Sequence, residues 1–268
     1  MKRFAAFLLA LAAAGAGLAA PPTFSPPTSY GGQSTLNESQ TAEALDAFRA
    51  AGPARPSYLE FDLRHLPRRG AETVFHGQLW ASRNEDGAVY RIDIVGGAHF
   101  LLQNGSRAKV WRAEGGAVTE VPSTEPLAPG LEIDAFDLQR PYLYWPLAGP
   151  VAVAPDRGRP SDVFLFHNPS PGGIAAVRAF LDSEYHAPVD VECQDAKGGL
   201  VRTFSLLDLK KVSGQWLPKD IDARDEATHN KTRFSLTGAA LGLDLSPSLF
   251  EPANLAGPAE APAGVERF

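Results

Sequence analysis

Alternating apolar and polar residues mark most of the chain from residue 57 onward. Residues 59–64 read LEFDLR, with an apolar side chain at every second position, and this period of two predicts a half-buried strand. Comparable runs follow at 75–82, 89–95, 100–103 and 109–113, separated by turns rich in Asn and Gly. Because short turns join consecutive runs, the pattern predicts an antiparallel meander.

The same pattern resumes in the C-terminal half. Strand-like runs occupy 163–167, 175–181, 189–194, 201–209, 216–222 and 231–238, and turns containing Gly separate several of them. Helices do not alternate with these runs, which argues against a parallel sheet. We therefore expect a mainly β protein with a few helices, built on one large antiparallel sheet that is either open or closed.

One segment near the start of the mature chain has helical periodicity. Within residues 34–51, Leu45 and Phe48 recur at helical spacing, Ser39 is the expected N-cap, and Gly52 with Pro53 ends the run. We expect this helix to pack on the sheet through Leu45 and Phe48 rather than to act as a lid.

A second segment, residues 134–146, reads DAFDLQRPYLYWP and holds too many large apolar side chains for an ordinary surface loop. It predicts a short helix over about 134–140 that stops at Pro141 and places the apolar cluster over one face of the sheet. Two interpretations stay open. The cluster is either a plug that closes the end of a barrel or sandwich, or a lid that contacts a ligand.

The N-terminus has the parts of a cleavable export signal. Lys2 and Arg3 precede an apolar stretch that begins at Phe4, and small residues surround Ala19. We expect cleavage after Ala19, so that residues 1–19 are a signal peptide and the mature protein is soluble in the periplasm. The single cysteine, Cys193, lies far from this bond, which argues against a lipid-anchored protein.

Both flanks of the mature chain are rich in Pro, Ala and Gly. Residues 20–33 have too few apolar side chains to order themselves and are expected to form a disordered linker. Residues 256–268 are expected to form a flexible tail. The remaining residues, 34–255, are predicted to be one domain, because all-β units often reach this size.

Charge and residue chemistry narrow the function. The net charge of −6 becomes −8 once Lys2 and Arg3 are removed, which argues against nucleic acid as a partner. The six histidines lack metal-ligand spacing, no serine lies in a GxSxG motif, and Cys193 sits in a strand-like run typical of a buried inert thiol. We expect no catalysis, no metal site and no cofactor.

Several short motifs occur along the chain in a characteristic order. They are RPYLYWP at 140–146, EYHAP at 184–188, a Gly-Gly turn into TFSL at 203–206, KKVSGQWLPK at 210–219, KTRF at 231–234 and LFEPANL at 249–255. In this order and combination, residues 56–255 resemble the LolA-like outer-membrane lipoprotein-sorting proteins.

The resemblance implies an unclosed half-barrel whose concave face, partly covered by helices, binds acyl chains of lipoproteins or other lipids. It further implies transfer between the inner and outer membranes, with an inner-membrane release complex and an outer-membrane acceptor as partners. We expect the carrier to be a monomer. An acyl chain of about 15 methylenes costs on the order of 12 kcal/mol to expose to water, so a soluble carrier removes a large barrier.

On this interpretation the lipid cavity is lined by aromatic strand faces and closed by the 134–146 segment. The expected cavity residues are Trp80, Tyr90, Ile92, Phe100, Trp111, Tyr142, Tyr144, Trp145, Phe164 and Phe166, and the expected lid residues are Phe136, Leu138 and Arg140. Arg140 is the nearest candidate for the arginine that holds the lid in such carriers. The same fold also serves regulators that sense stray lipoproteins, so a periplasmic sensor is an alternative, and a structural envelope protein with a filled core is another.

Overall fold

The computed structural model describes residues 34–50, 55–170, 173–184 and 187–268, and the predicted signal peptide (1–19) and linker (20–33) lie outside these ranges. The helices are α1 (Glu38–Ala50), α2 (Ala135–Gln139) and the 3-10 helices η1 (Pro141–Tyr144), η2 (Pro247–Phe250) and η3 (Pro252–Asn254). The strands are β1 (Ser34–Thr35), β2 (Ser57–Leu66), β3 (Thr73–Asn84), β4 (Gly87–Ile94), β5 (His99–Gln103), β6 (Lys109–Glu114), β7 (Ala117–Val121), β8 (Ala152–Asp156), β9 (Arg159–His167), β10 (Ala176–Asp182), β11 (Pro188–Gln194), β12 (Leu200–Val212), β13 (Gln215–Asp225), β14 (Lys231–Leu241) and β15 (Glu266–Arg267).

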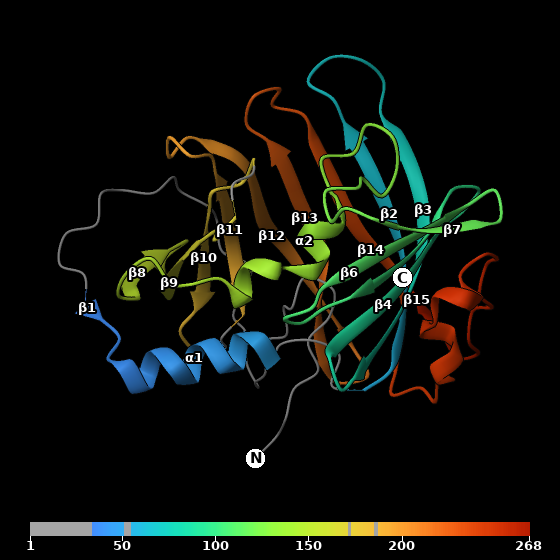
Figure 1. Ribbon diagram of the computed structural model, residues 1–268, viewed down its shortest axis with the longest axis horizontal. Helices are drawn as coiled ribbons and strands as arrows, with labels where there is room; N and C mark the ends of the chain where they lie inside the picture. The colour runs from blue at the N-terminus through green and yellow to red at the C-terminus, as the bar shows by residue number, and fades with distance from the viewer. Residues whose placement is uncertain (1–33, 51–54, 171–172, 185–186) are drawn as a thin grey trace.

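All of these strands belong to one antiparallel sheet. Its order is β1-β8-β9-β10-β11-β12-β13-β14-β2-β3-β4-β5-β6-β7, and β15 pairs with β14 outside this path. Because the end strands β1 and β7 do not pair with each other, the sheet stays open, and it curves around α2 (Figure 1). The expectation of one large antiparallel sheet forming a half-barrel is confirmed.

Strand register decides which side chains face the inside of the curve. Tyr90 lies opposite Leu102, and Ile92 lies opposite Phe100, so these side chains share one face. They belong to the main apolar core, which runs across the inner face from β9 to β6 in the order of the sheet. Burial on this face explains the alternation in the sequence, because every second residue of a strand points the same way.

Sequence analysis does not predict four of the strands: β1 and β15 have only two residues each, and β7 and β8 are hidden for other reasons. The edge strand β7 reads AVTEV and is largely exposed, so it shows little apolar alternation. Strand β8 contains Pro155, which lies opposite Pro160 of β9 near the hairpin turn. Proline is tolerated near strand ends and sheet edges, but it disguises such a strand as part of a proline-rich loop.

Helix α1 packs on the inner face of the sheet. Its N-terminus is closed reciprocally by Asn37 and Gln40, whose side chains each accept a hydrogen bond from the other's backbone N–H. Ser39, the expected N-cap, lies within the first turn instead. Phe48 is fully buried with its ring centroid 6.3 Å from that of Phe164 on β9, so the expectation that this helix packs on the sheet is confirmed.

The C-terminal segment, residues 243–268, covers part of the outer face of the sheet. Figure 1 shows it in red, outside the strands at the β3–β7 end. Tyr58 and Trp80 project outward and pack in a separate apolar cluster with Leu243, Leu249 and Val265. In the described part of the chain, no helix is long and apolar enough to span a bilayer.

A buried ion pair holds this segment in place. Arg91 lies 3.1 Å from Asp93 and also donates to the carbonyl oxygens of Asn254 and Gly257. Strand β15 then pairs with β14 at the end of the chain. The expectation of a flexible tail at 256–268 is corrected here, because a buried guanidinium and a strand ladder fix residues within it.

Phe61 of β2 lies opposite Gly77 of β3, and its ring fills the space where a side chain at Gly77 would be. This contact gives a first prediction. A Cβ atom at Gly77 would lie 2.3 Å from the Phe61 ring, which is stacked on Phe234 at 5.2 Å and has little room to move. We expect Gly77→Ala to lower the free energy of unfolding by about 1–3 kcal/mol through overpacking, measured by urea denaturation. Gly257→Ala, which adds a Cβ into open space, is the control and should change stability little. Equal effects of the two substitutions would contradict this account.

Candidate functional site

The segment formed by α2 and η1, residues 134–145, lies inside the curve of the sheet and is called the lid below (Figure 1). The side chain of Asp134 caps α2 by accepting from the backbone N–H of Asp137, and Asp137 accepts from the N–H of Asp134. Arg140 ends α2 in the left-handed conformation, with φ of 52°, and Pro141 begins η1. The predicted short helix that stops at Pro141 is therefore confirmed.

Aromatic rings join the lid to the sheet beneath it. Phe136 packs against Tyr142 and Trp145 at centroid distances of 6.1 and 5.8 Å. Tyr142 lies 5.7 Å from Phe166, which stacks on Phe164 at 5.8 Å. Phe164 and Phe166 are completely buried, so in this arrangement the lid is closed over the apolar inner face.

An ion cluster ties the lid to β12, and we call its members, Arg202, Asp134 and Asp137, the latch. The guanidinium of Arg202 lies 3.1 Å from Asp134 Oδ2 and 2.9 Å from Asp137 Oδ1. Arg202 also donates to the carbonyl oxygen of Glu132, just before the lid. A single sheet side chain thus binds three groups around the start of α2.

Burial makes the latch electrostatically unusual. The Asp137 side chain is 1% exposed, and that burial raises the pKa of its carboxyl well above the ordinary value. Arg202 opposes the shift, whereas the neighbouring Asp134 adds to it. Two buried carboxyls therefore share one guanidinium, and of the two it is Asp137 whose pKa is raised.

Further hydrogen bonds anchor the two ends of the lid. The Gln139 side-chain amide donates to the carbonyl oxygens of Gln103 and Lys109, at 2.9 and 2.8 Å. At the other end of the lid, Arg49 of α1 donates to the carbonyl oxygen of Leu143. These contacts use backbone carbonyls, so the lid docks on fixed positions of β5, β6 and α1.

The residues that precede the lid are held by a second group of polar side chains, at the rim of the inner face. Thr232 of β14 donates its hydroxyl to Glu132 at 2.6 Å and accepts from the Glu132 backbone N–H. His65 of β2 lies 3.3 Å from the same carboxylate. The residues before α2 are thereby fixed to β2 and β14, the two strands that join the halves of the sheet.

Most of the residues predicted for the cavity and lid gather in this one core. Seven of the expected cavity residues face it from the sheet or the lid, and Phe136 and Leu138 are buried in it as well: the seven are Tyr90, Ile92, Phe100, Tyr142, Trp145, Phe164 and Phe166. Tyr144 differs from them, because 42% of its surface is exposed and its ring lies beneath the guanidinium of Arg49.

Trp80 and Trp111 do not join this group. Trp80 lies opposite Arg91 in the β3–β4 pair, and Trp111 lies opposite Leu101 in the β5–β6 pair, which places both on the outer face. Trp80 packs with the C-terminal segment, and Trp111 packs near Leu255. Their assignment to the inner cavity is corrected, because strand register points them away from it.

Sequence analysis named Arg140 as the arginine that holds the lid, but two arginines, Arg140 and Arg202, make contacts at this site. Arg140 belongs to the lid, is buried, and lies over the Phe48 ring at 5.8 Å and beside Tyr90, where its charge opposes the rise that burial causes in the phenol pKa. Arg202 is the sheet residue that grips the lid carboxylates. Sequence analysis missed it, because nothing local marks an arginine at the start of a long strand as a partner for residues 65 or more positions away.

The described residues offer no chemistry beyond packing and ion pairing at this site. Among them, no group of three His, Cys, Asp or Glu side chains has the arrangement of a metal site. Cys193 is buried near the latch, and burial raises the pKa of its thiol to about 12, which disfavours the nucleophilic thiolate. The segment thus covers an apolar surface and is held there by ring contacts and ion pairs.

Comparisons with known proteins agree on the fold. A putative outer membrane lipoprotein-sorting protein domain from Vibrio parahaemolyticus superposes with a TM-score of 0.68 at 17% identity, covering 81% of this chain and 97% of that one. A DUF1329 family protein from Desulfovibrio piger gives 0.66 at 14% identity, with 81% and 98% covered. A LolA superfamily protein from Nitrosomonas europaea gives 0.62 at 15% identity, with 81% and 98% covered.

Sequence comparisons add less. A family model described only as an uncharacterized protein matches residues 173–257, which is less than half of the chain. No curated protein matches the sequence. The chain therefore shares the open half-barrel fold of the LolA superfamily, as its motifs predict, and identities below 20% extend the likeness to the fold alone.

The buried carboxyl of the latch generates a prediction about pH. Because folding raises the pKa of Asp137 above its ordinary value of 3.8, the folded protein binds the proton more tightly than the unfolded chain does. The contribution of Asp137 to stability is thus greatest at low pH and declines as pH rises through and above that value. We expect Asp137→Asn to remove this decline, measured by urea unfolding between about pH 4 and about pH 7.

The control for Asp137→Asn is a substitution that removes a carboxylate outside the latch. Asp208 is exposed and pairs with Lys219 at 3.1 Å, so Asp208→Asn is the matched control and should follow the wild-type pH profile. Parallel profiles for wild type and Asp137→Asn would show that folding does not raise the pKa of Asp137.

Proposed function

We propose that this protein is a periplasmic carrier or chaperone that binds acyl chains of lipoproteins or other lipids beneath the lid and transfers them between the inner and outer membranes. One observation carries the proposal: the aromatic inner face of an open sheet is closed by a short separate segment that a few polar contacts hold. A chain enters where that segment leaves, without any strand pairing being broken.

The contacts between the lid and the sheet explain why opening of the lid can be reversible. Opening replaces the ring contact between Tyr142 and Phe166 with contacts to an acyl chain, so most of the apolar surface stays out of water. The cost that remains is mainly the separation of Arg202 from its two carboxyls. Since burying charges is itself unfavourable, such a cluster resists opening less than apolar packing of similar size does.

Structural similarity and the N-terminal sequence both support a periplasmic location for this carrier. A structural relative is described as a lipoprotein-sorting domain, and the N-terminal residues have the composition of an export signal. A carrier in the periplasm would receive its cargo from an inner-membrane release complex and deliver it to an outer-membrane acceptor. A sensor on the same fold would instead bind an inner-membrane signalling protein, and a pull-down from envelope extracts separates the two roles.

Weakening the latch tests the proposal directly. Arg202→Gln leaves two buried carboxyls without their cation, which destabilises the closed lid by about 3–5 kcal/mol. We expect faster uptake of a fluorescent fatty acid by stopped-flow fluorescence, with the far-UV circular dichroism of the sheet unchanged. Combining Arg202→Gln with Asp137→Asn removes one of the two orphaned carboxyls and should slow uptake again, as a double-mutant cycle measures.

The control is Lys219→Gln, which breaks an exposed ion pair with Asp208 on β12–β13 and should leave uptake unchanged. Loss of global stability in Arg202→Gln without faster uptake would mean that the lid is a permanent part of the core. That outcome would favour a structural envelope protein, an alternative supported by the complete burial of Phe164 and Phe166.

A substitution at Trp145 gives a second test of whether residues 134–145 form a lid or part of a filled core. Trp145 is half-buried, packs against Phe136 at 5.8 Å and lies at the end of the lid. We expect Trp145→Ala to weaken fatty-acid binding while shifting thermal stability little. A loss of about 3–5 kcal/mol in stability with unchanged binding would identify a core plug instead.

A further inference from the structure

The rim of the sheet beside the lid carries a second feature, formed by residues 64–72 and 222–233. These segments contain the β2–β3 loop and the β13–β14 turn, which lie next to each other and project beyond the sheet at the top of Figure 1. The backbone N–H of Arg68 donates to Asn230 Oδ1 at 3.0 Å, joining the loop to the turn. We call these two segments the basic rim.

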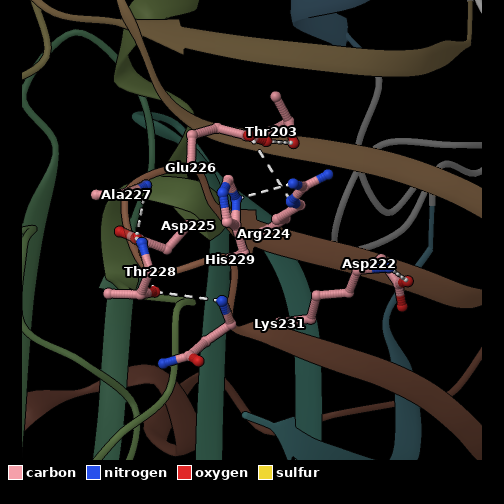
Figure 2. Close-up of polar contacts among 10 residues, drawn as sticks. Thr203, Asp222, Arg224, Asp225, Glu226, Ala227, Thr228, His229 and Lys231 are labelled. Atoms are coloured by element: carbon pink, nitrogen blue, oxygen red, sulfur yellow. Dashed lines mark hydrogen bonds and ion pairs between the residues drawn. The ribbon is translucent and has the colours of Figure 1, made fainter. Parts of the chain in front are cut away.

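The turn is internally fixed by its own polar side chains. Figure 2 shows Asp225 accepting hydrogen bonds from the backbone N–H groups of Ala227 and Thr228, and Thr228 Oγ1 accepting from the N–H of Asn230. These bonds lower the pKa of Asp225, so its carboxylate is ionised and engaged within the turn. The turn therefore forms a fixed support for the β2–β3 loop.

Charge on the basic rim is opposite in sign to that of the protein as a whole. The rim has six Lys or Arg residues and four Asp or Glu residues, whereas the whole chain has a net charge of −6. The four carboxylates are engaged locally: Glu72 with Arg64, Asp222 with Lys231 and Arg233, Glu226 with Thr203 and Arg224, and Asp225 within its turn.

Arg68 and Arg69 supply the excess positive charge. Both are exposed at the tip of the loop, and among the described residues neither side chain pairs with a carboxylate. A pair of adjacent guanidiniums on a projecting loop is the first part of this face to meet a partner. Because guanidinium groups bind phosphate oxygens well, the loop suits an anionic partner.

Two exposed valines lie on the same side of the rim. Val74 of β3, opposite Arg64, is 40% exposed, and Val95, in the β4–β5 turn, is 65% exposed. Val95 is joined to the top of β3 by its backbone N–H, which donates to the carbonyl oxygen of His76. Exposed aliphatic groups beside arginines are the combination by which peripheral proteins meet a lipid surface.

We propose that the basic rim is a docking surface for a membrane rich in anionic phospholipid. Arg68 and Arg69 would contact headgroup phosphates, and Val74 and Val95 would approach the acyl boundary. A membrane fits better than an acidic peptide, because the surface is a projecting tip and not a groove. This docking deepens the proposed function by naming where the protein meets lipid, and it is measurable without any cargo.

Vesicle binding tests this surface. The protein, purified after export, should cosediment with vesicles of phosphatidylglycerol and phosphatidylcholine more than with phosphatidylcholine alone, and added salt should release it. Arg68→Gln with Arg69→Gln should weaken binding about thirtyfold, from the usual contribution of two arginines near an anionic surface. The control, Arg107→Gln with Lys109→Gln, neutralises two exposed cations at the opposite end of the strands and should change binding little.

A fatty-acid uptake assay without vesicles separates docking from cargo binding. The Arg68→Gln, Arg69→Gln variant should take up the fatty acid at the wild-type rate, because neither residue touches the lid. Equal binding to both vesicle types, or equal losses in the rim variant and its control, would overturn the docking surface while leaving the lid proposal intact. Uptake that fails in every variant, with selective vesicle binding preserved, would overturn the lid proposal alone.

Discussion

The inner face of an unclosed sheet has to be covered by something other than a strand, and most of the structure follows from that constraint. A closed barrel fills its interior with its own side chains, whereas this sheet leaves an apolar surface that α1 and the lid bury. The covering segments make no ladder with the sheet, so side chains must fix them. The grip of Arg202 on Asp134 and Asp137 is the central contact of this kind, and it joins a lid encoded in the middle of the chain to a strand from the C-terminal half.

On both faces of the sheet, a covering segment is attached in a similar way. Inside, Arg202 binds carboxyls at the start of the lid; outside, Arg91 binds Asp93 and backbone carbonyls of the C-terminal segment. In both places a buried guanidinium supplies several donors to a segment that packs through apolar side chains. The difference lies in the partners. Outside, Arg91 reaches the covering segment through backbone carbonyls, whereas inside Arg202 reaches the lid through two carboxyls, and burial raises the pKa of one of them, Asp137.

Sequence patterns predicted the sheet and the lid well, because both leave local signals. Alternation at 59–64 and the stop at Pro141 each depend on neighbouring residues only. The missed features depend on distant ones. The exposed β7 and the proline-containing β8 lack the apolar period, and Arg202 has no local mark of its partners. Trp80 was assigned to the wrong face although the tight β3–β4 turn pairs it with Arg91, so counting register through that turn would have placed it correctly.

The pairing of β14 with β2 has a consequence for biogenesis. This ladder is the seam between the N-terminal meander and the C-terminal strands, and it pairs residues 57–66 with residues 231–241. Strand β2 therefore has an unpaired edge until β14, which follows it by several strands, has been made. A nascent chain therefore cannot complete the sheet before β14 has been made. The long sequence separation of this seam also favours slow folding, and the unpaired edge of β2 is open to association with other chains until the seam forms.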